Sequence, residues 1–160
     1  MTQKDRCSDA VLFTQWAEGS RTAGAALVER YFETVHRFFR TKASLEIDDM
    51  VQQTFLGCLE ARERFRAESS FKTFLLAIAR NQLFKHYRRL RDRSDFSPSA
   101  LRDLGTSPSG LAAKRQDEML LAEALDRLPR GTRLILELAY WEELDGAAIA
   151  QVLEVPLNTA

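Results

Sequence analysis

Hydrophobic residues recur at three- and four-residue steps along most of the chain, and no stretch sustains the alternation of a β-strand. Such steps place apolar side chains on one face of an α-helix. Residues 22–41 show the pattern clearly, with Leu27, Tyr31 and Val35 in one row. The pattern predicts an all-α protein.

Capping residues place the predicted helices of the first half of the chain. Ser8 or Asp9 is expected to cap a first helix that ends near Gly19. After the helix at residues 22–41, another is expected to begin near Asp48, because acidic side chains favour the positive end of the helix dipole.

A further helix is predicted from Ser69 or Ser70 to about Arg91, and a different texture follows it. Residues 92–113 hold two of the four prolines, two glycines and five serines, which is typical of a linker. The elements predicted beyond it are a helix over residues 114–128, a turn at residues 129–131, a helix capped by Thr132, and a short helix from Gly146 to Leu153 capped by Asp145. The sequence therefore predicts two small helical domains, residues 1–91 and residues 114–160, joined by a flexible linker at residues 92–113.

The formal net charge is zero, but the charges are segregated along the chain. Residues 62–93 carry 10 basic and 3 acidic side chains, whereas residues 1–61 and 94–160 have net charges of −2 and −5. Cations interleaved with aromatic rings suit a nucleic acid, since cations follow phosphates and exposed bases stack on rings. A solvated basic face over core aromatics has the same composition, and the charge pattern alone leaves both readings open. A membrane-surface helix fits less well, because the apolar face is needed for packing.

Residue spacing gives no sign of catalytic or metal-binding chemistry. Cys7 and Cys58 are far apart and lack ligand spacing, so neither a zinc site nor a disulfide framework is expected, and Cys58 is expected to be a small buried hydrophobe. With no nucleophile–base pair and no phosphate-cradling glycine loop, the sequence predicts no enzymatic activity and no cofactor. It also predicts no signal peptide and no membrane insertion, since no uninterrupted apolar run reaches about 18 residues.

Two shorter segments are weaker signals on their own. Residues 145–160 have the helix, turn and helix start of a helix-turn-helix, although many helical hairpins look similar. Residues 48–55 (DDMVQQTF) turn a carboxylate and amides outward, which would suit the arginines of a protein partner. By chemistry alone, an ordinary amphipathic surface is the better explanation of that segment.

Together these segments resemble two conserved regions of one protein family. DDMVQQTF, RFRAESSFKTFLLAIARN and HYRR resemble region 2 of the extracytoplasmic-function (ECF) sigma factors, and ALDRLPRGTRLILELAY with IAQVLEVPLNTA resembles their region 4. The resemblance covers about residues 25–91 and 117–160, in the family's order and spacing. It implies a helical transcription initiation factor whose partners are core RNA polymerase and promoter DNA.

The resemblance also implies roles for individual residues. In the family, region 2 docks on the clamp helices of the polymerase largest subunit and opens the minus-ten promoter element, while region 4 reads the minus-thirty-five element. The residues that match the polymerase-binding surface are Asp48, Asp49, Gln52, Gln53 and Thr54, with Phe55 expected to pack inward. The residues that match the minus-ten site are Arg64, Phe65, Arg66, Ser69, Ser70, Phe71, Lys72, Arg80, Asn81, Lys85, His86, Arg88 and Arg89. The start of the recognition helix is matched by Pro156, Leu157, Asn158 and Thr159.

Further partners follow from the resemblance alone. The linker matches a segment that family members thread towards the polymerase active-site cleft. Many members are held inactive by a membrane-bound anti-sigma partner, so such a partner is expected, with the chain itself cytoplasmic. Because many cations lie near it in the sequence, His86 is read as a neutral hydrogen-bonding group and not as a metal ligand. No small-molecule substrate is expected.

The sequence departs from the family pattern at three places. Ala148 stands where glutamate is usual, and Glu154 stands where the turn usually has glycine, which would cost about 1 kcal/mol if that residue has a positive φ. The chain stops at Ala160, where the recognition helix should begin, so we expect the sequence to be truncated there. A polymerase-independent helix-turn-helix regulator and a sequestered sigma remnant remain as alternative hypotheses.

Overall fold

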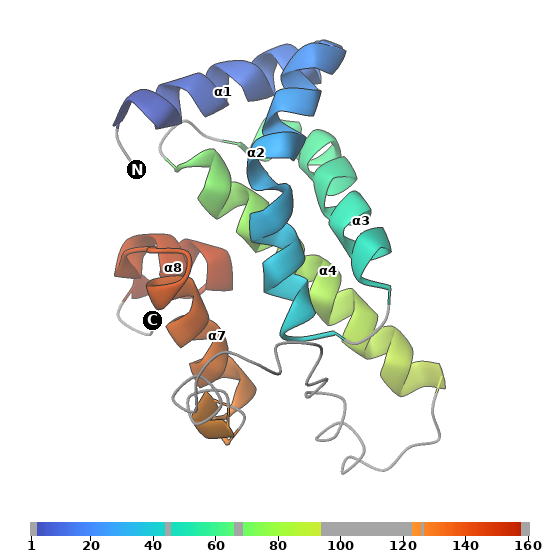
Figure 1. Ribbon diagram of the computed structural model, residues 1–160, viewed down its shortest axis with the longest axis vertical. Coiled ribbons are helices and arrows are strands. Elements are labelled where there is room, and N and C mark those ends of the chain that lie inside the picture. Colours follow the sequence, from blue (N-terminus) through green and yellow to red (C-terminus); the bar gives the residue numbers. More distant parts are fainter. Residues whose placement is uncertain (1–2, 44–45, 66–68, 94–122, 126, 158–160) are drawn as a thin grey trace, which may run out of the picture.

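The structure is a computed structural model that describes residues 3–43, 46–65, 69–93, 123–125 and 127–157 (Figure 1). Its helices are α1 (Gln3–Ala17), α2 (Arg21–Arg40), α3 (Ile47–Glu60), the 3-10 helix η1 (Arg62–Arg64), α4 (Phe71–Arg93), α7 (Arg130–Tyr140) and α8 (Gly146–Leu153). No strand occurs among the described residues, and the all-α prediction is confirmed. Within the same residues, no helix is both long enough and apolar enough to cross a membrane. Nearly all of the predicted linker and most of the helix predicted over residues 114–128 lie outside the described residues.

The predicted caps of α4 and α8 are confirmed. Ser70 Oγ accepts a hydrogen bond from the backbone N–H of Thr73 at 3.1 Å, and Asp145 Oδ1 accepts one from the backbone N–H of Ala148 at 2.8 Å. Each side chain satisfies a donor that has no partner within the helix itself. Local side-chain chemistry therefore sets the start of both helices.

The first helix begins earlier than its capping residues predicted. Because α1 starts at Gln3, Asp9 lies inside the helix, and its carboxylate is buried. There it accepts hydrogen bonds from the Arg30 guanidinium and the Tyr31 hydroxyl, both on α2. The prediction of an N-cap at Ser8 or Asp9 is wrong, because partners on another helix outweigh the local preference of aspartate for a cap.

The start of α7 also differs from the prediction. Arg130 and Gly131 belong to the helix instead of a turn, and Thr132 lies in its first turn instead of capping it. Pro129 occupies the N-cap position, where its carbonyl oxygen accepts a hydrogen bond from the backbone N–H of Arg133 at 3.0 Å. The fixed φ of proline suits the entry to a helix, which explains why the helix starts directly after it.

α2, α3 and α4 surround one apolar core, and α1 lies across one end of it (Figure 1). Its fully buried side chains include Leu27, Val35, Phe39, Cys58, Leu75 and Leu76. Burial raises the pKa of the Cys58 thiol, because removal from water disfavours the thiolate. The expectation that Cys58 is a buried hydrophobe is confirmed.

Aromatic rings and one glycine hold α1 in place. The ring of Phe13 lies 5.1 Å from that of Phe65 and 5.2 Å from that of Phe71, measured between centroids. Where α1 meets α2, a Cβ atom on Gly24 would lie 2.4 Å from Trp16 Nε1. The close contact therefore requires glycine at this position.

The α7–α8 hairpin (residues 130–153) packs against α2 and α4 (Figure 1). Leu134 and Leu138 of α7 are buried together with Ile149 and Val152 of α8. These four side chains belong to the same apolar cluster as the core of α1–α4. The two sets of helices therefore share one continuous core.

Candidate nucleic-acid and polymerase interfaces

The outer face of α3 carries most of the residues predicted to bind polymerase. Asp49 is exposed, and so are Gln52 and Gln53, which lie three and four positions after it on the same face; Asp48 is exposed beside them. Leu56 continues the same row and is 45% exposed. Sequence analysis missed Leu56, although its spacing from Gln52 and Asp49 places it on this face.

Thr54 does not belong to that surface. Its side chain is fully buried, and its hydroxyl donates a hydrogen bond to the Met50 carbonyl oxygen at 2.7 Å. Phe55 is buried beside it, as predicted. The assignment of Thr54 to a polymerase contact is therefore wrong, because Thr54 falls on the inward side of the helix.

The segment between α3 and α4 is divided between surface and core. Arg64 is exposed at the end of η1, whereas Phe71 is 1% exposed and packs among Phe13, Tyr31 and Phe65. A buried ring cannot stack on a DNA base, so Phe71 is structural and its assignment to the minus-ten site is wrong. Ser69 and Ser70 are half-buried, and Arg66 lies outside the described residues.

The outer side of α4 brings the remaining predicted DNA contacts together. Lys85, Arg88 and Arg89 are exposed, while Arg80 and Asn81 are half-buried one and two turns earlier. His86 is buried, and its Nδ1 lies 3.5 Å from Glu46 Oε2. Among the described residues, no group of three or more His, Cys, Asp and Glu side chains could hold a metal ion.

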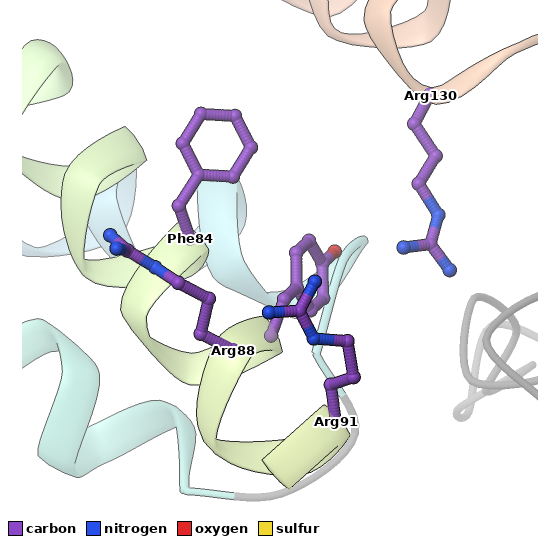
Figure 2. Close-up of a pocket in the computed structure, with 5 residues that line it drawn as sticks. Phe84, Arg88, Arg91 and Arg130 are labelled. Carbon is purple, nitrogen blue, oxygen red and sulfur yellow. The ribbon is translucent and has the colours of Figure 1, made fainter. Parts of the chain in front are cut away.

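A pocket of about 380 Å³ opens at the end of α4 (Figure 2). Its lining residues are Phe84, Tyr87, Arg88, Arg91 and Arg130. Figure 2 shows Phe84, Arg88 and Arg91 along α4, with Arg130 reaching towards them from the start of α7. The spacing of Phe84, Arg88 and Arg91 could have indicated the α4 side of the pocket, but no local pattern could have indicated Arg130.

A second, polar pocket of about 150 Å³ lies where α3 and α4 meet. Asp49 and Gln53 line it from α3, and Lys85 and Arg89 line it from α4. The face predicted to bind polymerase and the face predicted to bind DNA are thus adjacent.

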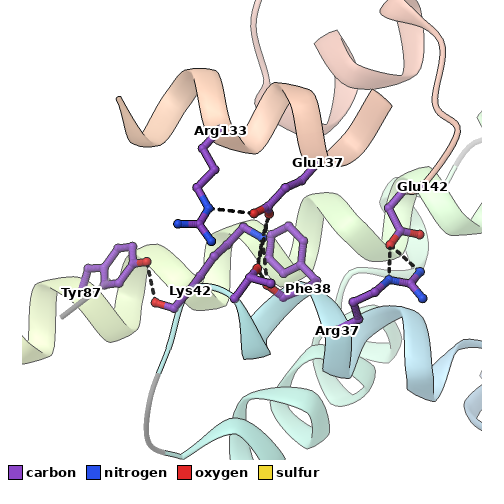
Figure 3. A network of polar contacts seen from close by, with 8 residues as sticks. Arg37, Phe38, Lys42, Tyr87, Arg133, Glu137 and Glu142 are labelled. Atoms are coloured by element: carbon purple, nitrogen blue, oxygen red, sulfur yellow. Dashed lines mark hydrogen bonds and ion pairs between the residues drawn. The ribbon is translucent and has the colours of Figure 1, made fainter. Parts of the chain in front are cut away.

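Ion pairs join α2 and the residues directly after it to the α7–α8 hairpin (Figure 3). Lys42 Nζ contacts Glu137, and Glu137 also accepts a hydrogen bond from Arg133 Nε at 2.9 Å. Burial lowers the pKa of Lys42, and the nearby Glu137 carboxylate opposes that shift. Arg37 Nη2 lies 2.7 Å from Glu142 Oε1. No sequence signal pointed to these pairs, because their partners are about a hundred positions apart.

Tyr87 links the end of α4 to the same network. Its hydroxyl donates a hydrogen bond to the Lys42 carbonyl oxygen at 2.8 Å (Figure 3). Burial raises the pKa of Tyr87, and the arginines Arg130 and Arg133 act in the opposite direction. The α4 face and the interface with the hairpin are therefore physically connected.

The end of the chain is described as far as the turn after α8. Glu154 has φ +56°, so the left-handed conformation that usually favours glycine is present at this residue. Pro156 and Leu157 are exposed, whereas Asn158 and Thr159 lie outside the described residues.

Comparisons with known proteins agree with the fold and with the motifs. Two family models match the chain: Sigma-70 region 2 over residues 27–93, and Sigma-70, region 4 over residues 118–160. The ECF RNA polymerase sigma-E factors of Escherichia coli K12 and Haemophilus influenzae are 26% and 27% identical to this chain. The alignments cover 97% of this chain and 87% and 88% of those proteins.

A solved structure shares the arrangement of helices. CnrH, determined in complex with the cytosolic domain of CnrY, superposes with a TM-score of 0.66 at 23% identity, over 95% of this chain and 86% of CnrH. This likeness concerns the fold alone. The two family matches and the aligned relatives do not favour a polymerase-independent regulator. The chain belongs to the sigma-70 family as an ECF sigma factor, a transcription initiation factor.

Proposed function

We propose that this sigma factor binds core polymerase through the outer face of α3 and holds the non-template strand of the minus-ten element on the outer side of α4. The observation that carries the proposal is the row of exposed cations Lys85, Arg88 and Arg89 on α4, beside the acidic and amide side chains of α3. Cations in such a row follow a phosphate backbone and gain from counterion release. One rigid pair of helices would then connect polymerase to DNA.

The family and the adjacent faces support finer assignments of partners. We infer that the polymerase element is the clamp-helix coiled coil of the largest subunit, whose basic side chains would meet Asp48 and Asp49. Region 4, matched over residues 118–160, would read the minus-thirty-five element with the recognition helix that the resemblance predicts to start at Pro156. The role is that of a non-enzymatic factor acting where the polymerase acts, in the cytoplasm.

We also propose regulation by an anti-sigma partner. The structurally similar CnrH was determined in complex with the cytosolic domain of CnrY. The exposed Tyr140 and Trp141 at the end of α7 offer apolar surface for a protein partner.

Asp49→Arg is expected to weaken binding to core polymerase by at least about tenfold, because a new cation would face the basic side chains of the partner. Fluorescence anisotropy of labelled protein titrated with core polymerase measures the affinity, and promoter-dependent run-off transcription should fall in parallel. Glu29→Arg makes the same charge change on an exposed position of α2 and should leave both unchanged. Equal effects of the two variants would contradict the proposal that α3 contacts polymerase.

Arg88→Ala combined with Arg89→Ala is expected to weaken binding of the polymerase-bound factor to a minus-ten non-template oligonucleotide. The slope of log affinity against log salt should become shallower by about 0.7 for each lost phosphate contact. A matched pair, Arg21→Ala with Arg40→Ala, removes the same charge from exposed positions of α2. A slope that does not differ between the two double variants would contradict the assignment of α4.

A further inference from the structure

The pocket at the end of α4 differs from the rest of the basic surface in the charges that line it (Figure 2). Its described lining residues include three arginines and no carboxylate. In the polar pocket between α3 and α4, by contrast, Lys85 and Arg89 share the lining with the carboxylates of Glu46 and Asp49. Cations around a common cavity repel one another, and an anion bound among them relieves that repulsion. The pocket at the end of α4 therefore suits an anionic ligand.

Two of the three arginines lie one turn apart on α4. Arg88 and Arg91 are both exposed, and their spacing makes them neighbours on one face of the helix. Arg91 Nε lies 3.9 Å from Asp92 Oδ1, but the two side chains are 66% and 73% exposed, so this surface pair holds Arg91 only weakly. Guanidinium groups bind phosphate oxygens through paired hydrogen bonds. A phosphate group is therefore the anion that fits this side of the pocket best.

Two aromatic rings line the same pocket. Phe84 lies one turn before Arg88 and is 39% exposed. The ring of Tyr87 is held in place, because its hydroxyl donates a hydrogen bond to the Lys42 carbonyl oxygen at 2.8 Å. The guanidinium carbon of Arg130 lies 5.0 Å from the centroid of the Tyr87 ring. Rings placed beside cations in this way offer a nucleobase a surface on which to stack.

The size and the charge of the pocket favour a small nucleotide over a nucleic-acid strand. Its volume of about 380 Å³ falls within the range of about 300–1,000 Å³ that is typical of small-molecule sites. A terminal phosphate carries a charge of about −1.5 to −2 at neutral pH, so a polyphosphate brings several charges into one pocket. A strand brings only one charge for each nucleotide. Arg130 also lies on α7, outside the residues that match the minus-ten motif.

We propose that this pocket binds a nucleoside 5′-diphosphate or triphosphate. The base stacks on the exposed ring of Phe84, beside Tyr87. The phosphates lie against the guanidinium groups of the three lining arginines. Because α4 and α7 both supply lining residues, the bound nucleotide also stabilises the folded chain. This site does not depend on the proposed function, although the two share Arg88.

The experiment titrates the full chain with ATP and with GTP by isothermal titration calorimetry. The tighter-binding of the two should bind at least about tenfold more tightly than adenosine or inorganic triphosphate, because only a nucleotide contacts both the rings and the guanidinium groups. The melting temperature, followed by circular dichroism, should rise with the concentration of that nucleotide. Triphosphate that binds as tightly as the nucleotide would reduce the site to a patch of positive charge and would overturn the inference. No binding of either nucleotide at about 1 mM would overturn it as well.

Two substitutions with matched controls test the lining residues. Phe84→Ala should weaken nucleotide binding by about tenfold through the loss of a stacking surface. Phe32→Ala removes a ring of almost equal exposure from α2 and should leave the affinity unchanged. Arg130→Ala should also weaken binding by about tenfold, whereas Arg127→Ala removes an exposed guanidinium outside the pocket and should change the affinity by less than about twofold. Melting curves without nucleotide confirm that each variant is folded, and equal effects within either pair would contradict the site.

A minus-ten oligonucleotide distinguishes a free nucleotide from a DNA strand as the occupant. Arg130→Ala should leave binding of the oligonucleotide to the polymerase-bound factor within about twofold of wild type, because the strand does not enter the pocket. If Arg130→Ala instead weakens oligonucleotide binding and leaves nucleotide binding unchanged, the pocket belongs to the DNA strand and the inference falls. The proposed function rests on Lys85, Arg88 and Arg89 and would survive that result.

Discussion

Phe71→Ala is expected to lower the free energy of unfolding by about 3–5 kcal/mol, the range for removing a large buried ring from a packed core. The side chain is almost completely buried, with ring centroids of Phe13 and Tyr31 at 5.2 Å and 5.5 Å. Those rings belong to α1 and α2, so the cavity would weaken the packing between α1, α2 and α4. Urea denaturation followed by circular dichroism gives the change.

Phe84→Ala is the matched control for this substitution. Phe84 lies on the same helix but is exposed, so its loss should cost less than about 1 kcal/mol. A base-stacking role for Phe71 would produce the reverse outcome, with normal stability and weaker binding of the minus-ten strand. Normal stability of Phe71→Ala would therefore restore the residue to the DNA site.

Glu137→Gln is expected to destabilise docking of the α7–α8 hairpin by about 3–5 kcal/mol, because it leaves the buried Lys42 ammonium without its counter-ion. The double variant Lys42→Met with Glu137→Leu should recover most of that loss, since neither charge then has to be removed from water. Trp141, at the end of α7, reports the transition by fluorescence in a Trp16→Phe background.

The control for this pair is Glu143→Gln, which removes a carboxylate from an exposed position of the same hairpin. Its urea midpoint should match that of the background protein. The contrary result is a double variant, Lys42→Met with Glu137→Leu, that is as unstable as Glu137→Gln alone. In that case, the uncompensated charge of Lys42 does not cause the loss of stability in Glu137→Gln.

Local chemistry predicted the parts of the fold that are decided within a few residues. Ser70 and Asp145 cap their helices because the donors they satisfy lie three positions away. The apolar spacing predicted the extent of α2 to within one residue at each end. The faces proposed to bind polymerase and DNA come from the resemblance, because their motifs are contiguous in the chain.

Residues decided by distant partners could not be predicted in this way. Asp9 has the chemistry of a cap, but Arg30 and Tyr31 bury it inside a helix. Thr54 and Phe71 lie within the recognised motifs, yet both are buried, since a motif combines contact residues with core residues. The ion pairs of Lys42 and Arg37 connect segments that no periodicity relates.

The continuous core shared by the two sets of helices means that they should unfold together. Leu138 and Val152 of the hairpin are buried in the same apolar cluster as the core of α1–α4. A substitution that improves packing at either position should therefore raise one melting temperature for the whole molecule, not a separate one for the hairpin.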